Sequence, residues 1–596
     1  MCIRDRLNTT GAQNTAVGQN TLESNTTADN NTALGYEALK ANTTGTQNVS
    51  VGAFALDANT TASSNTAVGY NALSANTTGS QQVAIGNRCA ESTTTGTQNT
   101  AVGSNALQVN TTGDQNVAIG CESLDANTTG NYNNAIGYLS LSANTDGSYN
   151  VANGQSALRR STTGSYNTAI GQGSLAYNTT ADNNTAVGAQ SLLANTTGTQ
   201  NTAVGTYALD ANTTASYSTA IGYAALTANT TGANNTAVGR AALNSNTTAS
   251  NNTAVGFEAL EACTTGTSNT AVGTNALKSI TTNNNCTAVG KDALKLNTAA
   301  NCTAVGFAAL EACTTGEGNV AIGMQAAPVL TTGSENICIG SLAGHDLTTG
   351  QSNTIIGYEA AAQITNASQN TAIGLYALTS QTGTLVSTAV GYRALKSSTT
   401  GGSNVAMGRD VMYNLTTGTT SVAIGNDALG AITTQSNNTA IGHAAGSSST
   451  GANNVFLGYN SQPPSAGNNN TFVMGNNTTD NLRCNTSTIN SYSDRRDKTD
   501  IVDLPIGLDF VNKLRPVKFK WQHREENIKN GRIETGFIAQ ELQVVQNESD
   551  ANYVRSVDEA NPDKLAASYS KLIPVMVQAI KELSAEVEQL KSQLNN

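Results

Sequence analysis

Ser493 and Lys498 are a nucleophile and a base that stand five residues apart near the C-terminal end of this 596-residue chain. A serine hydroxyl is a weak nucleophile until a neighbouring base takes its proton. Lysine can serve as that base where removal from water favours its neutral form. The pair therefore predicts a Ser–Lys dyad. The alternative interpretation is a charged turn that performs no chemistry.

The dyad opens the first of four sequence blocks in the C-terminal part. Ser493–Ile501 reads SDRRDKTDI, which fits the pattern S-D-x-R-x-K-x-x-I. The next three blocks are LDFVNKLRPVKFKW at Leu508–Trp521, TGFIAQEL at Thr535–Leu542 and YSKLIPVMVQAIKEL at Tyr569–Leu583. With these four blocks in order, residues 493–596 resemble the endosialidase-type intramolecular chaperone and autoprotease domain of phage tail spikes and fibres.

The resemblance implies a single-turnover serine autoprotease. In that family the Oγ atom of Ser493 would attack the carbonyl of Tyr492 and cut the Tyr492–Ser493 bond, with Lys498 as the base. Because the bond belongs to the same chain, proximity replaces substrate binding. Asp494 and Arg496 are expected to orient the dyad or to hold the cleavage site. Whether this chain still cleaves itself is left open, and no other enzyme activity is expected.

The end of the chain predicts a coiled coil over residues 573–594. Apolar residues alternate there at spacings of three and four, which is the a/d seam of just over three heptads. β-branched Ile at the a positions fits three strands, and Pro574 stands where a helix begins and Pro is tolerated. The alternative is an amphipathic helix that packs on its own domain. The seam consists of Ile573, Met576, Ile580, Leu583, Val587, Leu590 and Leu594.

Most of the chain before this part is a tandem seventeen-residue repeat, as the step from Gly18 to Gly35 illustrates. The motif Asn-Thr-Ala-Val-Gly and its variants close on a glycine at every step from Gly18 to Gly475. Two steps, which end at Gly306 and Gly458, are shorter by a single residue. The repeat predicts about 28 coils, none of which could bury its apolar residues without its neighbours.

One unit, Asn65–Gln81, indicates the shape of a coil. Thr66 and Val68 point to one face of a short strand, and Ala67 and Gly69 point to the other. An Ala-Leu pair marks a second apolar stretch, and the NTTG sequence is typical of a turn. Such a short unit with central glycines excludes a helical hairpin, and leucine-rich repeats need about 20–29 residues. The fold class is therefore mainly β, a long parallel β-solenoid or β-roll before a small α+β chaperone domain.

The repeats resemble the heads of trimeric autotransporter adhesins, and they also look like repeats of phage tail fibres. In the adhesin heads, small residues let three chains approach closely. The resemblance implies this role for Ala67 and Gly69. The present unit is longer than that of the adhesin family, so the handedness and cross-section of the solenoid are left open.

The predicted domain organisation has four parts. Residues 1–13 stay unassigned, because Met1–Arg6 match no repeat phase and resemble either a sequencing-adapter artefact or a short native cap. Residues 14–475 form the solenoid shaft. Residues 476–492 form a polar neck, and residues 493–596 form the chaperone with its C-terminal coiled coil.

Charge separates the repeat from the C-terminal part. Only 12% of the residues are charged, and 34 of the 69 charged residues lie in 476–596. The net charge of −11 argues against a nucleic-acid partner, which needs clustered Lys and Arg. No apolar run of about 18 residues occurs, so no membrane insertion is expected. His345, His443 and His523 lack metal-ligand spacing, and neither a metal nor a cofactor is expected.

Two features of the repeat invite structural interpretations. Its Asn-x-Thr sequences match glycosylation sequons, but stacked Asn side chains that form a hydrogen-bonded ladder are the favoured interpretation. Cys286 and Cys302 replace the strand Asn in successive coils, so their Cα atoms are expected about 5 Å apart, within disulfide range. Free thiols are favoured there, because strand stacking does not aim two sulfurs at each other.

Together these features predict a homotrimeric tail fibre or spike of a phage virion that attaches to a host-surface glycan or protein. A C-terminal trimer seed would fix the register of a rod whose repeats offer many registers. The first alternative is the head of a bacterial adhesin at the cell surface. The second is a glycan-degrading tail spike whose catalytic part is missing. The sequence identifies neither the host nor the receptor.

Overall fold

The computed structural model describes residues 7–476, 478–479, 493–522, 531–559 and 565–595. The chain divides into two compact units, Met1–Asn366 and Ala367–Asn596. The first unit consists of repeat coils, and the second holds further coils and the C-terminal region.

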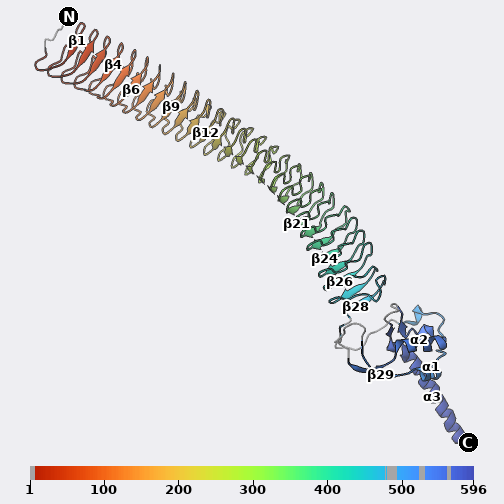
Figure 1. The fold of residues 1–596 in the computed structure, drawn as a ribbon. Coiled ribbons are helices and arrows are strands. Elements are labelled where there is room, and N and C mark those ends of the chain that lie inside the picture. Colours follow the sequence, from red (N-terminus) through yellow and green to blue (C-terminus); the bar gives the residue numbers. More distant parts are fainter. Residues whose placement is uncertain (1–6, 477, 480–492, 523–530, 560–564, 596) are drawn as a thin grey trace. The chain divides into compact units, whose positions relative to one another are not determined.

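The first unit is a parallel β-solenoid to which every coil contributes one three-residue strand (Figure 1). Neighbouring coils pair so that equivalent residues stand side by side, as Thr66 does with Val83 and Ala67 with Ala84. The strands are β1 (Thr15–Val17), β2 (Thr32–Leu34), β3 (Val49–Val51), β4 (Thr66–Val68), β5 (Val83–Ile85), β6 (Thr100–Val102), β7 (Val117–Ile119), β8 (Asn134–Ile136), β9 (Val151–Asn153), β10 (Thr168–Ile170), β11 (Thr185–Val187), β12 (Thr202–Val204), β13 (Thr219–Ile221), β14 (Thr236–Val238), β15 (Thr253–Val255), β16 (Thr270–Val272), β17 (Thr287–Val289), β18 (Thr303–Val305), β19 (Val320–Ile322), β20 (Ile337–Ile339) and β21 (Thr354–Ile356).

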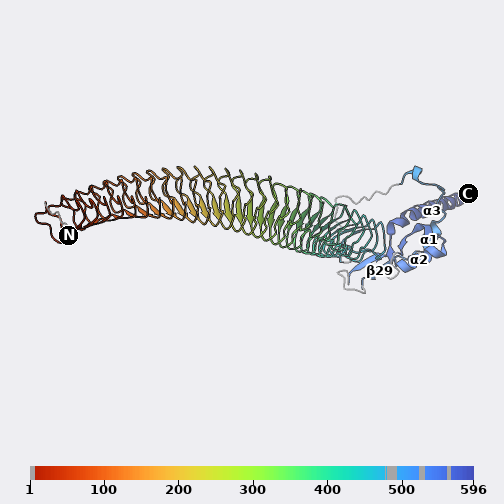
Figure 2. The same ribbon diagram turned by 90° about the horizontal axis from the view of Figure 1, so that it is seen from above.

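The second unit begins with coils of the same kind, whose turns lie over one another along the stack (Figure 2). Their strands are β22 (Thr371–Ile373), β23 (Thr388–Val390), β24 (Val405–Met407), β25 (Val422–Ile424), β26 (Thr439–Ile441), β27 (Val455–Leu457) and β28 (Phe472–Met474). Consecutive strands again pair in parallel. The predicted parallel β-solenoid of 17-residue coils is therefore confirmed.

The middle residue of a strand points into its coil. Ala67 is fully buried, whereas Thr66 and Val68 on either side of it are partly exposed. Leu73, in the turn that follows the strand, is also fully buried. Leucine and alanine thus form the core of the coil, and the β-branched side chains of the strand face outward.

The role expected for Ala67 and Gly69 in the approach of three chains is therefore wrong. Ala67 lies inside its own coil, and Gly69 packs along the stack. Gly69 has a φ of +140°, and a Cβ atom there would collide with the carbonyl oxygen of Gly86 in the next coil. A side chain is excluded by both the backbone conformation and this contact. Small residues serve the stacking of coils within one chain.

The interior is packed differently in coils that lack the usual buried leucine or the usual strand alanine. Gly446 takes the place of the buried leucine in its coil, with a φ of +60°. The next coil carries Phe456 where alanine is usual, and its ring is fully buried. A Cβ atom on Gly446 would collide with that ring. The larger residue therefore occupies the volume that the missing leucine leaves.

Asparagine side chains form ladders inside the coils. The Oδ1 of Asn48 accepts the backbone N–H of Asn65 at 3.0 Å, and Asn65 Nδ2 donates to the carbonyl of Gly79 at 3.1 Å. In the turn, Asn76 Nδ2 donates to Asn59 Oδ1 at 3.1 Å. These amides have no exposed surface, so their polar groups are paired in the core. The predicted Asn ladder is confirmed.

Cys286 and Cys302 are free thiols, and both are buried. Cys286 Sγ lies 3.2 Å from the carbonyl oxygen of Ala299, and Cys302 Sγ lies 3.3 Å from that of Gly316. In other coils the amide of the strand Asn uses the corresponding carbonyl. Both thiols contact a carbonyl of the turn that follows them and neither forms a disulfide, in agreement with the interpretation of free thiols.

A small α+β region follows from Ser493 and ends in a helix, as predicted. Phe510, Leu542, Leu572 and Val575 lie in its core. Its strands pair antiparallel, β29 with β30 and β31 with β32. Its elements are η1 (Arg495–Asp497), α1 (Leu508–Lys513), β29 (Val517–Lys520), β30 (Ile533–Gly536), α2 (Ala539–Glu548), η2 (Asn552–Val554), β31 (Val557–Asp558), β32 (Ala566–Ala567), η3 (Tyr569–Leu572) and α3 (Ile573–Leu594).

Candidate functional site

Ser493 and Lys498 are brought together by the short helical turn η1. Asp494 caps this turn, because its Oδ1 accepts the backbone N–H of Arg496 at 2.9 Å. The turn ends at Lys498, whose backbone N–H donates to the carbonyl of Arg495. The Nζ of Lys498 then donates a hydrogen bond to Ser493 Oγ. With a neutral lysine, the same contact lets Nζ accept the hydroxyl proton.

Asp494 and Arg496 form an ion pair within the turn. One guanidinium nitrogen of Arg496 lies 2.6 Å from Asp494 Oδ2, and Nε lies 3.1 Å from Oδ1. The hydrogen bonds from the Arg496 side chain and then from its backbone lower the pKa of Asp494. The carboxylate therefore stays charged as a cap. This geometry favours the orienting role, one of the two roles expected for these residues.

Both members of the pair are exposed in a single chain. Burial favours the neutral form of a lysine, so a working dyad needs an enclosure that these residues lack here. Tyr492, the other side of the predicted cleavage site, lies outside the described residues. The described residues thus supply the contact between Lys498 Nζ and Ser493 Oγ.

The later sequence blocks pack against one another. The second and third blocks meet where β29 pairs with β30. The third meets the fourth at Phe537, whose backbone N–H donates to the hydroxyl of Tyr569 at 3.2 Å. Gly536 leaves room for this contact, because a Cβ atom there would collide with the Tyr569 hydroxyl. Residues that are far apart in sequence therefore form one domain. Along the chain, this domain follows the segment that contains Ser493 and Lys498.

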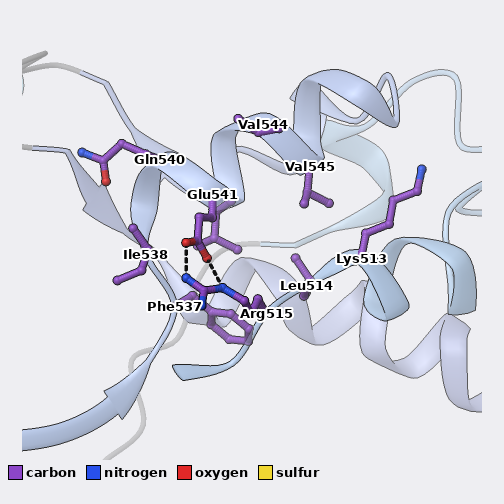
Figure 3. A pocket seen from close by; sticks show the side chains of 10 residues that line it. Lys513, Leu514, Arg515, Phe537, Ile538, Gln540, Glu541, Val544 and Val545 are labelled. Atoms are coloured by element: carbon purple, nitrogen blue, oxygen red, sulfur yellow. Dashed lines mark hydrogen bonds and ion pairs between the residues drawn. The ribbon is translucent and has the colours of Figure 1, made fainter. Parts of the chain in front are cut away.

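A hollow of about 350 Å³ lies between α2 and the segment that follows α1 (Figure 3). Leu514, Phe537 and Val545 give it an apolar lining. Arg515 and Glu541 form an ion pair there, with Arg515 Nε 2.9 Å from Glu541 Oε2. The hydrogen bond from the guanidinium lowers the pKa of Glu541.

Sequence reasoning assigned no role to the Arg515–Glu541 pair. Both residues lie inside the quoted blocks, and this was the signal that could have singled them out. They are 26 residues apart, and only the folded domain sets them together. Neither Ser493 nor Lys498 lines this hollow.

The predicted coiled-coil seam lies on an exposed face of α3. Its seven residues are all exposed, from 41% for Val587 to 85% for Leu594. The helix buries Val575 and Ala579 instead. Glu582 also joins it to the domain, because its Oε2 accepts the backbone N–H of Leu508 at 2.6 Å. One face of α3 thus packs on its own domain, and the seam remains unoccupied within the chain.

The two described histidines each contact a neighbouring side chain. His345 Nδ1 lies 2.6 Å from Asp346 Oδ1, and His443 stacks on Tyr459, while His523 is outside the described residues. Among the residues described, no three His, Cys, Asp or Glu side chains are placed to share a metal ion. No helix in the described part of the chain is long and apolar enough to cross a bilayer.

The Ser493–Lys498 pair lies in a segment that matches a known protein family. Residues 493–550 match the family model described as the chaperone of endosialidase. The matched segment begins at Ser493 and includes the Ser–Lys pair and the first three blocks. The resemblance inferred from those blocks is confirmed over this segment. No curated protein matches the chain.

Proposed function

We propose that this protein is a homotrimeric tail fibre or spike of a phage virion, which attaches to a host-surface glycan or protein. A C-terminal chaperone assembles it and then cuts itself off. The chaperone match and the parallel β-solenoid before it fit such a protein. The observation that carries the proposal is the contact between Lys498 Nζ and Ser493 Oγ at the start of the matched segment.

The chemistry is an acyl shift followed by hydrolysis. Ser493 Oγ attacks the carbonyl carbon of Tyr492 while its proton passes to Lys498 Nζ. The peptide C–N bond breaks, and the released amine of Ser493 takes that proton. Water then hydrolyses the new ester, which leaves a carboxylate on Tyr492 and restores the hydroxyl of Ser493. The step occurs once because the substrate is the chain itself.

The exposure of the dyad in one chain connects cleavage with assembly. A lysine works as a base after it is withdrawn from water. We infer that neighbouring chains provide this enclosure, so that only an assembled trimer is cut. Cleavage then removes the chaperone and makes assembly irreversible.

The exposed seam of α3 supports the assembly of three chains. Residues such as Ile580 and Leu583 are exposed at 66% and 49%. Burial of apolar surface contributes about 25 cal/mol per Å², which favours seams of neighbouring chains packing together. Parallel helices would place three identical chains in one register.

The outer face of the strands supports the same arrangement for the shaft. Among the strands β1–β28, no position carries Asp, Glu, Lys or Arg. The third strand residue is often exposed and apolar, as at Leu34, Ile119 and Ile441. Three equivalent faces that meet around an axis would suffer repulsion from any charge they shared. An uncharged, β-branched face suits that position.

Sedimentation of the whole Ser493→Ala chain tests the assembly. We expect a trimer of uncut chains, because the variant lacks only the nucleophile. An Ile580→Asp/Leu583→Asp variant should sediment as a monomer, while Glu586→Ala, off the seam, should remain trimeric. A monomeric Ser493→Ala protein would overturn the proposed function.

A further inference from the structure

Three aspartates of the first unit occupy the same position of their coils, and each is followed by a tyrosine at the same spacing. Asp57, Asp125 and Asp210 each follow the buried leucine of their coil directly. A tyrosine stands thirteen positions after each of them, at Tyr70, Tyr138 and Tyr223. Because a full coil is seventeen positions long, this spacing sets the tyrosine on the next coil.

The first of these pairs lines a hollow on the solenoid surface. The hollow has a volume of about 360 Å³ and is lined by Phe54, Asp57, Tyr70, Asn71, Ser74 and Ala75. The rings of Phe54 and Tyr70 stand edge to face with their centroids 6.0 Å apart. Tyr70 is 49% exposed, so its ring remains available to a ligand.

One oxygen of each of the three carboxyl groups is unsatisfied, although backbone N–H groups of the aspartate and of the following alanine also donate to the carboxyl group. The Oδ1 atoms of Asp57, Asp125 and Asp210 are buried, and none has a hydrogen-bond partner. Burial raises the pKa of all three carboxyl groups, that of Asp125 to about 6. The Oδ1 atoms themselves are covered, so a donor from outside would bind the other carboxyl oxygen of these partly exposed residues.

Another acidic residue at the same place in its coil shows the contrast. Glu91 accepts hydrogen bonds from Arg88, Asn71 and Gln108 at 2.8–3.0 Å. Although burial acts to raise the pKa of Glu91, these hydrogen bonds lower it. The protein can therefore satisfy a carboxylate at this place, and it does not do so for Oδ1 of Asp57.

The residues around Asp210 are nearly the same as those around Asp57. Tyr207 and Tyr223 stand edge to face at 6.0 Å, as Phe54 and Tyr70 do. Asp210 lies in the sequence between them, three residues after Tyr207. Tyr223 is 53% exposed. Asp210 takes the same repeat positions relative to Tyr207 and Tyr223 as Asp57 takes relative to Phe54 and Tyr70, so the arrangement recurs in this unit.

The set around Asp125 lacks the first of the two aromatic rings. Glu122 stands where the other two coils have Phe54 and Tyr207. Asp125 therefore has a second carboxylate in place of the first ring, and only Tyr138 offers an aromatic surface. Only the sets that contain Asp57 and Asp210 therefore have both aromatic rings.

We propose that Phe54–Asp57–Tyr70 and Tyr207–Asp210–Tyr223 are two subsites for neutral saccharides. This rests on the proposed function of attachment and names the surface that performs it. A sugar ring offers an apolar C–H face to an aromatic ring and hydroxyl donors to a carboxylate. Both groups occur at each subsite, side by side on consecutive coils.

The charge at the subsites selects against acidic sugars. Asp57 has Glu37 and Lys40 as its charged neighbours, which leaves one net negative charge. At Asp210 no other charged group contributes. A sialic acid carboxylate would meet like charge at either subsite.

Two subsites in one chain allow a polymeric glycan to bind twice. Asp57 and Asp210 are nine coils apart in sequence, or about 43 Å at about 4.8 Å per coil. A second contact by the same polymer is effectively intramolecular, so its overall affinity exceeds that of one subsite. The expected ligand is therefore a neutral oligosaccharide or polysaccharide.

Binding of the full chain to immobilised oligosaccharides tests this inference. The probes are oligomers of glucose, galactose, mannose and N-acetylglucosamine, with sialylated oligosaccharides as the acidic set. We expect binding to at least one neutral oligomer and none to the sialylated set. Tyr70→Ala/Tyr223→Ala should weaken that binding at least tenfold, and Asp57→Asn/Asp210→Asn should do the same.

The control variant is Tyr166→Ala, which removes a tyrosine that is 58% exposed from a coil without such an aspartate. It should bind like the wild type. The Asp→Asn variants should also melt no lower than the wild type, because they remove a poorly satisfied charge. Neutral binding that survives both double variants, binding to sialylated probes alone, or no binding to any probe would overturn the subsites. The α3 seam and the outer strand face, which the proposed trimer uses, contain none of these residues, so failure here is distinct from failure of the proposed function.

Discussion

The ammonium group of Lys498 donates a hydrogen bond to the hydroxyl oxygen of Ser493, across a short turn that Asp494 caps. Local sequence alone creates this contact, since all three residues lie within six positions. The pair is therefore available as soon as the turn forms. Its chemistry depends on whether Lys498 can lose its proton.

Lys498→Arg tests that dependence. Arginine keeps the positive charge and can donate to Ser493 Oγ, but it does not deprotonate in proteins. We expect self-cleavage to slow at least about 100-fold, with assembly unchanged. Electrophoresis of the expressed chain over time measures the rate. Cleavage at the wild-type rate would show that Lys498 is not the base.

Phe456→Ala should lower stability through a cavity, and Gly446→Leu should repair it. The ring of Phe456 fills the space that leucine occupies in other coils. Removing it should cost about 3–5 kcal/mol, and Gly446→Leu alone should also destabilise by overpacking. The double variant restores the usual Leu and Ala and should recover most of the loss. Denaturant unfolding of the four proteins gives the coupling, and additive losses would contradict the packing described.

Asp125→Asn should stabilise the solenoid at neutral pH and have no effect in acid. The folded pKa of Asp125, about 6, lies above its ordinary value of 3.8, so the folded chain holds the proton more tightly. Its contribution to stability is therefore greatest below pH 4 and is lost as the pH rises through 6. At pH 7.5 the variant should be about 1 kcal/mol more stable, after allowance for screening of this half-exposed group.

Thermal unfolding at pH 7.5 and at pH 4 measures both parts of that prediction. The advantage of Asp125→Asn should be present at the higher pH and absent at the lower. An equal advantage at both values would assign the effect to packing rather than to charge.

Cys302→Asn should stabilise its coil by about 1 kcal/mol. The present thiol makes only weak contacts, to the carbonyl of Gly316 at 3.3 Å and to that of Ala300 at 3.5 Å. An asparagine there would donate to the same carbonyl and accept an N–H of the next coil, as Asn65 does. We expect a higher melting temperature for Cys302→Asn and an unchanged melting temperature for Cys302→Ala. Equal shifts for the two variants would mean that loss of the thiol, rather than the ladder, is responsible.

The repeat made much of the fold predictable from sequence. Every coil presents the same strand, glycine and turn, so the period and the Asn ladder could be inferred. The direction of burial could not, because alternation places Ala67 and Val68 on opposite faces without saying which is inside. That choice depends on Leu73, which fills the narrow interior from the turn and leaves room only for a small residue such as alanine.

In the candidate site, too, some contacts could be predicted from the sequence and others could not. Ser493 and Lys498 were predictable because a five-residue turn connects them. Arg515 and Glu541 were not, because their contact requires the folded domain across 26 residues. The Asp57–Tyr70 pair has meaning only once the coil length places the two residues on adjacent coils.

Intact-mass measurement of the purified wild-type protein tests self-cleavage and assembly together. We expect two fragments, residues 1–492 and 493–596, with the larger one trimeric under native conditions. Ser493→Ala should give a single uncut chain. A wild-type protein that remains whole as an assembled trimer would contradict the claim that the C-terminal chaperone cuts itself off.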